Sequence, residues 1–423
     1  MISAFSIALS ALKADSTAIN VVGNNLANLN TTGFKASTAV FQDMMSQSIG
    51  VGSGSGQVGM GVGPLATIND LSQGTLTTTN GATDVAIQGN GYFIVSNASN
   101  QTLYTRDGTF QIDSTGNLVT VNGDHVQGWS AVGGVLNPNG PIGNISVPVG
   151  GTIPATATTT ISLNVNLNAE APTTGTGSTF SAPIQVFDSQ GSSHTLTITF
   201  TKTGANTWDY DVTVPNADLA TPLAAGTPLL HGTLPVFDAN GALPTPATLP
   251  APPVAIAITG GWADGANTVA TINWNLYDSN GVPSITQYAQ ASGVGSTTQD
   301  GAAAGQVVNV GLQNGGLVVA KYSNGQQLTV GQLALATFQN PDSLLSVGNN
   351  ELATTPATSP AAIGTANSGS RGQIVAGSLE TSTTDMATEF TNLLTYQRSY
   401  QAASRVITTS DQLTQETVNL IRP

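Results

Sequence analysis

Residues 2–29 read ISAFSIALSALKADSTAINVVGNNLANL, and this stretch places apolar side chains at helical spacing. One set recurs every seven residues and a second set fills the steps between: Phe5, Leu12, Ile19 and Leu26, then Leu9, Val22 and Leu29. Apolar residues at this period predict an amphipathic α-helix with one apolar stripe. The chain therefore begins with a helix whose stripe needs a partner.

Residues 386–421, near the other end of the chain, carry a similar stripe. Its members are first seven residues apart and then drift by one position: Met386, Leu393, Tyr400 and Ile407, then Val406, Leu413 and Leu420. This drift is typical of an α-helix, because its 3.6-residue turn does not divide evenly into seven. Ser382 and Asp385 resemble a capping box and predict the start of this second helix.

Both stripes need apolar partners. An amphipathic helix most often packs against its own domain, but here the two helices lie at opposite ends of a chain that otherwise reads as β-structure. Burying the apolar side chains of one helix recovers less free energy than ordering its backbone costs. We therefore predict that the partners are other copies of the chain, and that the termini are largely disordered until several copies pack together.

The composition excludes several classes of function. Charged residues make up only 8% of the 423 residues, and the net charge is −14 with nine Lys and Arg. Without a basic patch, binding to nucleic acid or to an anionic membrane surface is not expected. There is no cysteine, which excludes disulfides, thiolate zinc sites and thiol nucleophiles.

The start of the chain does not resemble a secretory signal peptide, because it has no basic segment and Ser3, Ser6 and Ser10 interrupt its apolar run. No stretch approaches the roughly eighteen apolar residues of a membrane helix. A surface rich in Ser, Thr, Asn, Gln and glycine suits an extracellular protein. We expect the chain to stay inside the cell or to leave it by a route without a cleaved signal.

The region between the helices reads as short strands separated by turns. Four D-x-x-G segments fit type I turns closed by a left-handed glycine and predict antiparallel hairpins: Asp113–Gly116, Asp188–Gly191, Asp238–Gly241 and Asp278–Gly281. We predict a mainly β fold with terminal α-helices and nested domains. These are a terminal helical domain (1–40 with 378–423), a Gly/Ser-rich linker or extended arm (41–75), a discontinuous β-domain (76–145 with 291–377) and an inserted β-barrel or sandwich (146–290).

The sequence offers little chemistry for a catalytic, cofactor or metal site. His125, His194 and His231 are scattered without a helical i, i+4 pair, and the D-x-x-G turns lack the ligand pattern of a calcium loop. Residues 61–66 match G-x-G-x-x-A but open no βαβ unit. We predict no catalytic, cofactor-binding or metal-binding residues and no enzyme activity.

A secreted β-rich adhesin or carbohydrate-active protein is the alternative from another class. It would need a carboxylate pair or an exposed aromatic platform in the inserted domain, where three of the four tryptophans lie: Trp208, Trp262 and Trp274. We predict that these tryptophans are core residues.

Residues 23–35, which read GNNLANLNTTGFK, closely resemble the N-terminal signature of the bacterial flagellar rod and hook family. Three segments resemble the C-terminal helix of that family: Glu389–Phe390, Tyr396–Ala402 and Ser410–Leu413. Three more are similar to its middle β-domain: Asp84–Phe93, Tyr104–Phe110 and Phe338–Pro341. The matched ends identify the chain as a member of this family.

Hook-type members of the family are the most similar, on the inserted domain and on three segments: Tyr288–Ser292, Thr298–Gly301 and Tyr322–Gly325. The alternative is a distal rod or other axial protein, which should lack the inserted domain. Two features depart from the pattern. Thr383 stands where the family usually has Asn, and the Gly/Ser-rich stretch near residues 50–63 is longer than in a minimal hook protein.

The resemblance implies a homopolymeric, flexible, curved tube outside the cell that transmits motor torque to the filament and forms part of the export channel. It implies export through the flagellar type III apparatus, and contacts with the distal rod, hook cap and hook–filament junction proteins. It implies no cofactor. It assigns subunit packing to Phe5, Leu9, Leu12, Ile19, Val22, Leu26, Gly33, Phe34, Phe390, Leu393, Gln397, Arg398, Tyr400, Ile407 and Leu413. Asn24, Asn25 and Asn28 either end the helix or are satisfied between subunits.

Overall fold

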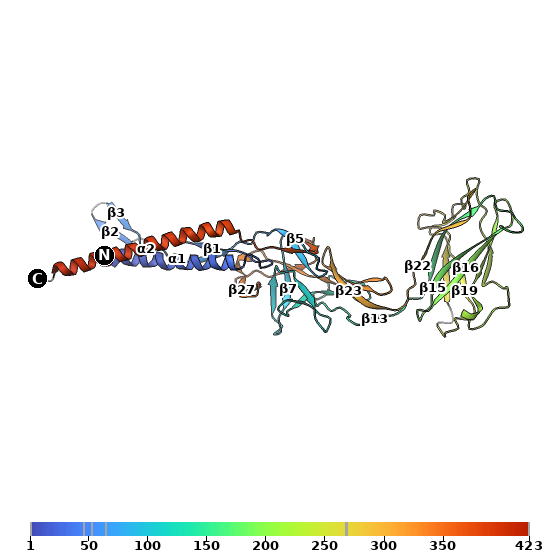
Figure 1. The fold of residues 1–423 in the computed structure, drawn as a ribbon, viewed down its shortest axis with the longest axis horizontal. Coiled ribbons are helices and arrows are strands. Elements are labelled where there is room, and N and C mark those ends of the chain that lie inside the picture. Colours follow the sequence, from blue (N-terminus) through green and yellow to red (C-terminus); the bar gives the residue numbers. More distant parts are fainter. Residues whose placement is uncertain (1, 45–46, 52–53, 64–65, 267–269, 422–423) are drawn as a thin grey trace. The chain divides into compact units, whose positions relative to one another are not determined.

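The computed structural model describes residues 2–44, 47–51, 54–63, 66–266 and 270–421. It confirms a mainly β chain with a long helix near each end, α1 (Ile2–Ala27) and α2 (Met386–Ile421) (Figure 1). The chain forms two compact units. Unit 1 comprises Met1–Val149, Asn309–Ala320 and Gln327–Pro423, and unit 2 comprises Gly150–Val308 and Lys321–Gln326.

Unit 1 holds both helices and most of the short strands. Its first part contains β1 (Ser37–Val40), β2 (Gln47–Val51), β3 (Gly54–Val58), β4 (Ala66–Asn69), β5 (Leu76–Thr78), β6 (Val85–Gln88), β7 (Tyr92–Ser96), β8 (Thr102–Thr105), β9 (Phe110–Ile112), β10 (Leu118–Thr120), β11 (His125–Ser130) and β12 (Gly143–Asn144). Its later part contains β25 (Gln327–Leu333), β26 (Leu335–Thr337), β27 (Leu345–Gly348), β28 (Glu351–Ala353), β29 (Ala362–Gly364), β30 (Gln373–Ala376) and β31 (Ser378–Glu380).

The main sheet of unit 1 is built around β7. Neighbouring strands follow the order β25-β11-β7-β8-β28-β27, and β26 also pairs with β7. Four successive residues of β7, Tyr92–Val95, are buried, as expected of a strand covered on both faces. Tyr92, Tyr104 and Trp129 belong to the core cluster on one side.

The Gly/Ser-rich stretch between α1 and the main sheet contains paired strands. β2 pairs with β3 and β1 pairs with β4, both antiparallel. β5 pairs with β31 and β6 with β30, so the chain just before α2 returns to the segment that follows α1. Within 41–75 the described strands are β2, β3 and β4, and the bounds of the linker or extended arm stay a prediction.

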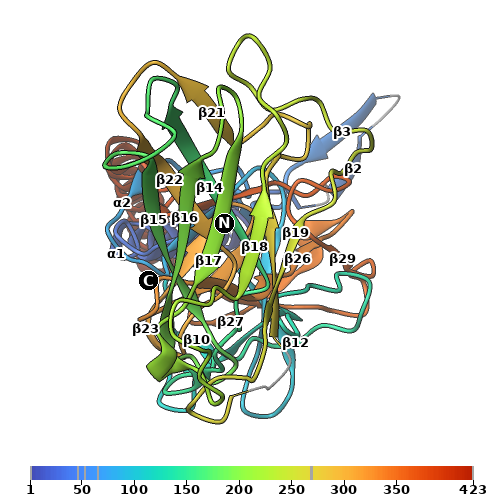
Figure 2. The same cartoon turned by 90° about the vertical axis from the view of Figure 1, so that its right-hand side faces the viewer.

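Unit 2 is a two-sheet structure. Its strands are β13 (Thr152–Ile153), β14 (Thr160–Asn168), β15 (Thr179–Phe187), β16 (Ser193–Lys202), β17 (Trp208–Thr213), β18 (Leu230–Thr233), β19 (Val254–Ile258), β20 (Ala270–Asn275), β21 (Ile285–Tyr288) and β22 (Gly293–Gln299), and the boundary between the units falls within β23 (Gly305–Gln313) and β24 (Leu317–Tyr322). One sheet has the order β15-β16-β17-β18 and the other β19-β20-β14-β21 with β22. Figure 2 shows β15, β16 and β17 side by side.

Strict alternation of buried and open positions in β14 and β16 builds the core between these sheets. The three tryptophans named above are all buried in that core, which confirms the prediction: Trp208, Trp262 and Trp274. β14 is parallel to β20 and β21. The antiparallel pairing predicted from the turns therefore does not extend to these two strand pairs, because D-x-x-G turns predict local connections and not which distant strands pair.

All four D-x-x-G segments form the predicted turn. In each, the glycine has a positive φ, between 76° and 90°, and donates its N–H to the carbonyl of the aspartate. The aspartate Oδ1 accepts two further backbone N–H groups in each turn, as at Asp113 and Asp278. Two of the turns join strands that pair with each other, β9–β10 and β15–β16, whereas the other two close loops.

Candidate assembly site

α1 and α2 pack side by side in unit 1 (Figure 1). The residues of α1 that are buried within the chain are mostly small: Ala8, Ala14, Asp15, Ala18, Val22 and Asn25. Short side chains let two helix backbones approach closely. Ala8 and Asp15 are offset by three residues, or roughly 60° around the helix, from the seven-residue set that begins at Phe5, whereas the buried Val22 belongs to the predicted stripe. Within the chain, α1 therefore has α2 as one partner, and the prediction that other copies cover the rest of the stripes stays a prediction.

The predicted packing residues differ widely in exposure. Buried ones are Val22, Asn25 and Gly33; half-buried ones are Leu12, Ile19, Leu26, Asn28, Phe34, Leu393 and Ile407; exposed ones are Phe5, Leu9, Asn24, Phe390, Gln397, Arg398, Tyr400 and Leu413. Much of the predicted stripe is thus left open when the two helices pack on each other.

A row of large apolar side chains on α2 lies open to solvent. Met386, Phe390 and Leu394 are 50%, 50% and 56% exposed, and their i, i+4, i+8 spacing places them on one strip of the helix. We call this strip the α2 row. On α1, Phe5 and Leu9 form a similar exposed pair. Contiguous exposed apolar side chains mark surfaces that other proteins cover.

Asn25 joins the end of α1 to the start of α2. Its Nδ2 donates to Glu389 Oε1 at 3.0 Å and to the Ser37 carbonyl at 2.8 Å, and its Oδ1 accepts the Ser37 N–H at 3.0 Å. Asn28 ends the helix instead, since its Nδ2 donates to the Asn24 carbonyl. The buried asparagine is therefore satisfied within the chain, and Asn24 is left exposed.

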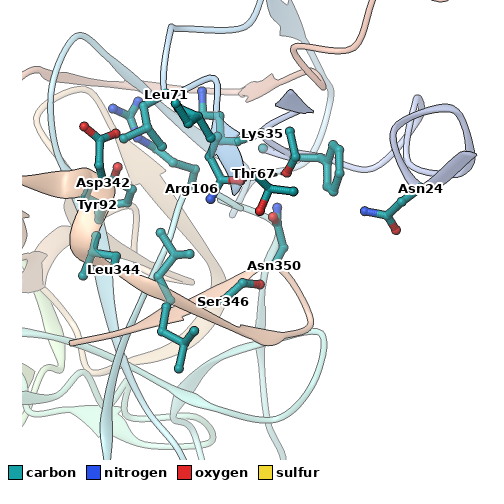
Figure 3. Close-up of a pocket in the computed structure, with 17 residues that line it drawn as sticks. Asn24, Lys35, Thr67, Leu71, Tyr92, Arg106, Asp342, Leu344, Ser346 and Asn350 are labelled. Atoms are coloured by element: carbon teal, nitrogen blue, oxygen red, sulfur yellow. Dashed lines mark hydrogen bonds between the residues drawn. The ribbon is translucent and has the colours of Figure 1, made fainter. Parts of the chain in front are cut away.

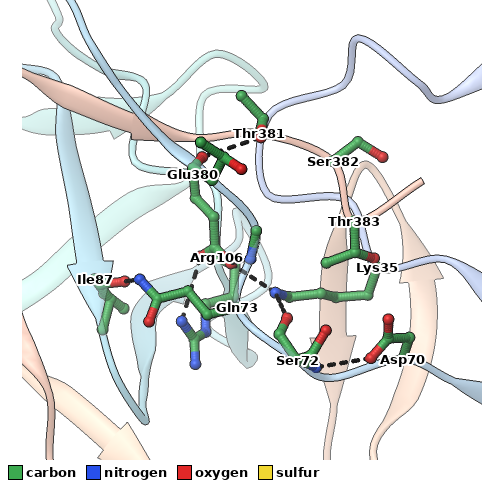
Figure 4. Close-up of polar contacts among 12 residues, drawn as sticks. Lys35, Asp70, Ser72, Gln73, Ile87, Arg106, Glu380, Thr381, Ser382 and Thr383 are labelled. Carbon is green, nitrogen blue, oxygen red and sulfur yellow. Dashed lines mark hydrogen bonds and ion pairs between the residues drawn. The ribbon is translucent and has the colours of Figure 1, made fainter. Parts of the chain in front are cut away.

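A buried ion cluster ties this helix junction to the β-strands (Figure 4). The Glu380 carboxylate, at the end of β31, contacts Lys35 Nζ at 2.6 Å and Arg106 Nη1 at 3.3 Å and accepts the Gly74 N–H at 2.8 Å. Burial lowers the pKa of Lys35, although Glu380 opposes this effect. Arg106 also donates to the Gly89 carbonyl. The segment after α1, the segment before α2 and the end of β8 thus share one charged centre.

Gly33 and Thr383 fit closely into the same junction. Gly33 has φ +67°, and a Cβ there would lie 2.8 Å from the Arg106 carbonyl carbon. Its N–H donates to the Glu380 carbonyl at 2.7 Å. Thr383, the departure from the family pattern, accepts the Ala36 N–H on its hydroxyl at 2.9 Å. The hydroxyl therefore supplies an acceptor at this position.

A cavity of about 500 Å³ opens beside the junction (Figure 3). Asn24 lies on one side of it and Tyr92, Arg106 and Asp342 on the other. The arm adds a further contact to the helices, because Phe41 packs against Tyr396 with ring centroids 5.8 Å apart. The arrangement holds side chains in place and exposes apolar rows, which suits assembly.

Unit 2 holds a cluster that was not predicted from the sequence, formed by Asp188, His194 and Asp264, whose potential ligand atoms lie within 4.8 Å of one another. The three histidines were predicted to bind no metal because none has a helical i, i+4 partner. One feature of the sequence does indicate that two of these residues are close: His194 follows a D-x-x-G turn by three residues, and the next strand brings it back to the turn aspartate.

No helix among the described residues is long and apolar enough to span a membrane.

Four family models match the chain. They describe the flagella basal body rod protein (residues 5–35), the flagellar hook protein FlgE/F/G D1 domain (86–168), the flagellar basal body protein FlaE D2 domain (164–302) and the flagellar basal body rod FlgEFG protein C-terminal region (375–420). The two terminal matches cover the segments that meet at Asn25 and Glu389.

Curated relatives match over nearly the whole chain. Flagellar hook protein FlgE of Salmonella typhimurium is 35% identical over 426 residues, covering 98% of this chain and 99% of the relative. The chain belongs to the flagellar hook protein family. The hook protein FlgE of Treponema pallidum is 32% identical over 457 residues, with 98% of each chain covered. The crystal structure of Helicobacter pylori flagellar hook protein FlgE2 matches with a TM-score of 0.48 and 14% identity, over 66% of this chain and 94% of that one.

The hook protein family is a family of structural proteins, and the chain is accordingly a structural subunit of the bacterial flagellar hook. The matched family models include no enzyme. The chain is located in the hook and basal body of the flagellum.

Proposed function

We propose that copies of this chain polymerise into a tube through their terminal helices. The observation that carries the proposal is that α1 and α2 pack on each other through small residues and still expose large apolar ones, the α2 row and the pair Phe5 and Leu9. Exposed apolar side chains on a helix gain free energy when another subunit covers them. In the tube these rows become inter-subunit seams, with the half-buried Leu12, Ile19 and Leu26 beside them.

The junction supports a mechanical role in transmitting torque. A force applied to the helices reaches the strands through the Asn25–Glu389 contact and the Glu380 cluster. Removing one partner from such a buried charge centre costs several kcal/mol, so the connection resists being pulled apart. The tube then passes motor torque to the filament as a curved, flexible joint, with its inner wall forming part of the export channel.

Low charge supports bending of the tube. Only 8% of residues are charged, so few ion pairs between outer domains have to break when neighbouring subunits slide.

We further propose the nested domain boundaries predicted from the sequence. We also propose that the chain is exported unfolded through the flagellar type III apparatus. At its ends, the polymer would contact the distal rod, hook cap and hook–filament junction proteins.

The polymerisation of two double variants tests this proposal. Phe390→Gln with Leu394→Gln removes most of the α2 row with residues that favour helices. Val132→Gln with Val135→Gln is the matched control, because these valines are 83% and 73% exposed elsewhere in unit 1. We expect both monomers to fold, with circular dichroism like that of the unmodified chain, and only the control to form tubes by electron microscopy. Normal tubes from the α2-row variant would refute the proposal.

A further inference from the structure

Unit 2 brings together three side chains that can bind a metal ion. Asp188 follows the end of β15, and His194 lies on β16 opposite Val186 in the antiparallel register. Asp264 comes from the loop after Trp262. The distance from Asp188 Oδ2 to His194 Nε2 is 3.2 Å. All three potential ligand atoms lie within 4.8 Å of one another.

The two buried members of the cluster are held in place before any ligand arrives. Asp188 is 1% exposed, and its Oδ1 accepts the N–H groups of Gln190 and Ser192, which leaves Oδ2 directed at the imidazole. The His194 ring is stacked on Trp262, with centroids 3.8 Å apart and an angle of 11° between the planes. Neither side chain has to become ordered when a ligand binds, which lowers the entropy cost of binding.

The far side of the imidazole is arranged like that of a metal-bound histidine. His194 is 7% exposed, and its Nδ1 is buried without a well-formed hydrogen bond. The nearest acceptor for this nitrogen is Asp218 Oδ2, at the longer distance of 3.4 Å. A histidine that binds a metal through one nitrogen usually directs the other toward a carboxylate, which fixes the ring. Asp218 occupies that position.

Among the described residues of 150–308, no Lys or Arg forms an ion pair with the aspartates of the cluster. Lys202 is the only Lys or Arg between residues 150 and 308, and its Nζ donates to the carbonyls of Ala169 and Ala171. Asp188, Asp264 and Asp218 therefore lie near one imidazole, and the one Lys of residues 150–308 is engaged elsewhere. Asp188 and Asp264 share a side-chain hydrogen bond, and when both carboxylates are ionised they repel one another in a partly buried site. A divalent cation would remove that repulsion.

We propose that Asp188, His194 and Asp264 bind one first-row divalent cation, Zn²⁺ in preference to Ca²⁺ or Mg²⁺. Tetrahedral zinc with bonds near 2.0 to 2.1 Å places adjacent ligand atoms roughly 3.3 Å apart, close to the 3.2 Å between Asp188 and His194. An imidazole ligand favours zinc, whereas calcium requires six or more oxygens. The ion fastens the loop that carries Asp264 to the β15–β16 turn, in a chain that has no disulfide.

Metal titration of the tag-free full-length chain, first stripped with a chelator, tests this site. When Zn²⁺ is added without any other ligand, calorimetry should show one zinc ion bound per chain. The bound ion should raise the unfolding temperature of the monomer. Asp264→Asn, a change at an exposed residue outside the core, should weaken binding at least tenfold. His231→Gln is the matched control, because His231 also pairs with an aspartate, Asp211, but has no third ligand.

The proposal would be overturned by any of these results: no zinc binding, equal binding by the Asp264→Asn variant, or tighter binding of Ca²⁺ than of Zn²⁺. Loss of binding in His231→Gln would also place the ion elsewhere. Quenching of tryptophan fluorescence by Co²⁺ gives an independent readout, since Trp262 stacks directly on the proposed ligand. That quenching should be present in the control and reduced in Asp264→Asn.

Discussion

Asn25 and Glu389 lie 364 positions apart in the sequence and share a hydrogen bond of 3.0 Å in the interior of unit 1. The bond connects the last turns of α1 to the first turn of α2. Since Asn25 also bonds both backbone groups of Ser37, one side chain holds together the first helix, the last helix and the first strand. The two ends of the chain are joined at this point.

Asn25→Ala should therefore destabilise the helix junction. The change leaves the Glu389 carboxylate and the backbone of Ser37 without their partner, at a cost of about 1 to 3 kcal/mol in the free energy of unfolding. Urea unfolding of the monomer, followed by circular dichroism, measures this. Asn24→Ala is the control and should change stability by less than about 0.5 kcal/mol, because Asn24 is exposed. Equal effects of the two changes would mean that the junction contributes nothing.

Glu380→Gln should be more damaging. It leaves Lys35 and Arg106 as buried cations without their carboxylate, and breaking a buried charge centre in this way costs about 3 to 5 kcal/mol. The same urea titration applies. Glu416→Gln is the control. It removes one carboxylate charge from a solvent-exposed part of α2 and should hardly change the free energy of unfolding. A Glu380→Gln variant as stable as Glu416→Gln would show that the cluster does not hold the junction.

Two glycines near the end of α1 should respond to alanine in opposite directions. Gly33→Ala places a Cβ against the backbone of Arg106 and Asp107 at a positive φ, which should cost about 1 to 3 kcal/mol. At Gly23, inside the helix, a Cβ has nothing within 4 Å, so Gly23→Ala should stabilise by about 0.5 to 1 kcal/mol. Thermal unfolding of both variants checks the signs. If both variants shift the unfolding temperature in the same direction, the prediction from the surroundings of the two glycines would be wrong.

Glu351 should make unit 1 less stable as the pH rises. Burial, followed by the neighbouring Asp124, raises the pKa of Glu351 from its ordinary value of 4.5 to about 7. Because the folded state holds this proton more tightly than the unfolded state, its contribution is complete below about pH 4.5 and is lost as the pH passes 7. Urea midpoints of the unmodified chain should fall across that range relative to those of Glu351→Gln. Parallel midpoints in the two proteins would mean that Glu351 does not titrate there.

Helical periodicity was enough to locate both terminal helices, but it missed the small residues of α1 that pack within the chain beside the predicted Val22. The reason is that alanine contributes little to a hydrophobic pattern, whereas two helices in close contact select small residues such as Ala8 and Ala18. The D-x-x-G turns were predictable because their cause is local: an aspartate accepting nearby N–H groups and a glycine at positive φ.

Contacts between distant residues could not be predicted in the same way. Lys35 and Glu380 are 345 positions apart, and no periodicity in a single sequence relates them. The Asp188, His194 and Asp264 cluster escaped notice for the same reason, since the loop carrying Asp264 is not adjacent to the other two in the sequence. Pairing of this kind depends on the sheet topology, which turn motifs do not specify.

The prediction of disorder in the free monomer stays a prediction, and the structure makes it more specific. Residues near Asn25 and Glu389 have partners within the chain, whereas described residues 411–419 of α2 are all exposed. Amide hydrogen exchange of the monomer should therefore show protection near the junction and rapid exchange beyond Ser410. Strong protection of 411–419 in the monomer would contradict this.

Electron cryo-microscopy of the polymer, at a resolution that shows large side chains, would reveal whether the terminal helices hold the subunits together. We expect a tube whose inner wall is made of α1 and α2, with Met386, Phe390 and Leu394 covered by a neighbouring subunit. A polymer held together by its β-domains alone, with this row still open to solvent, would contradict it.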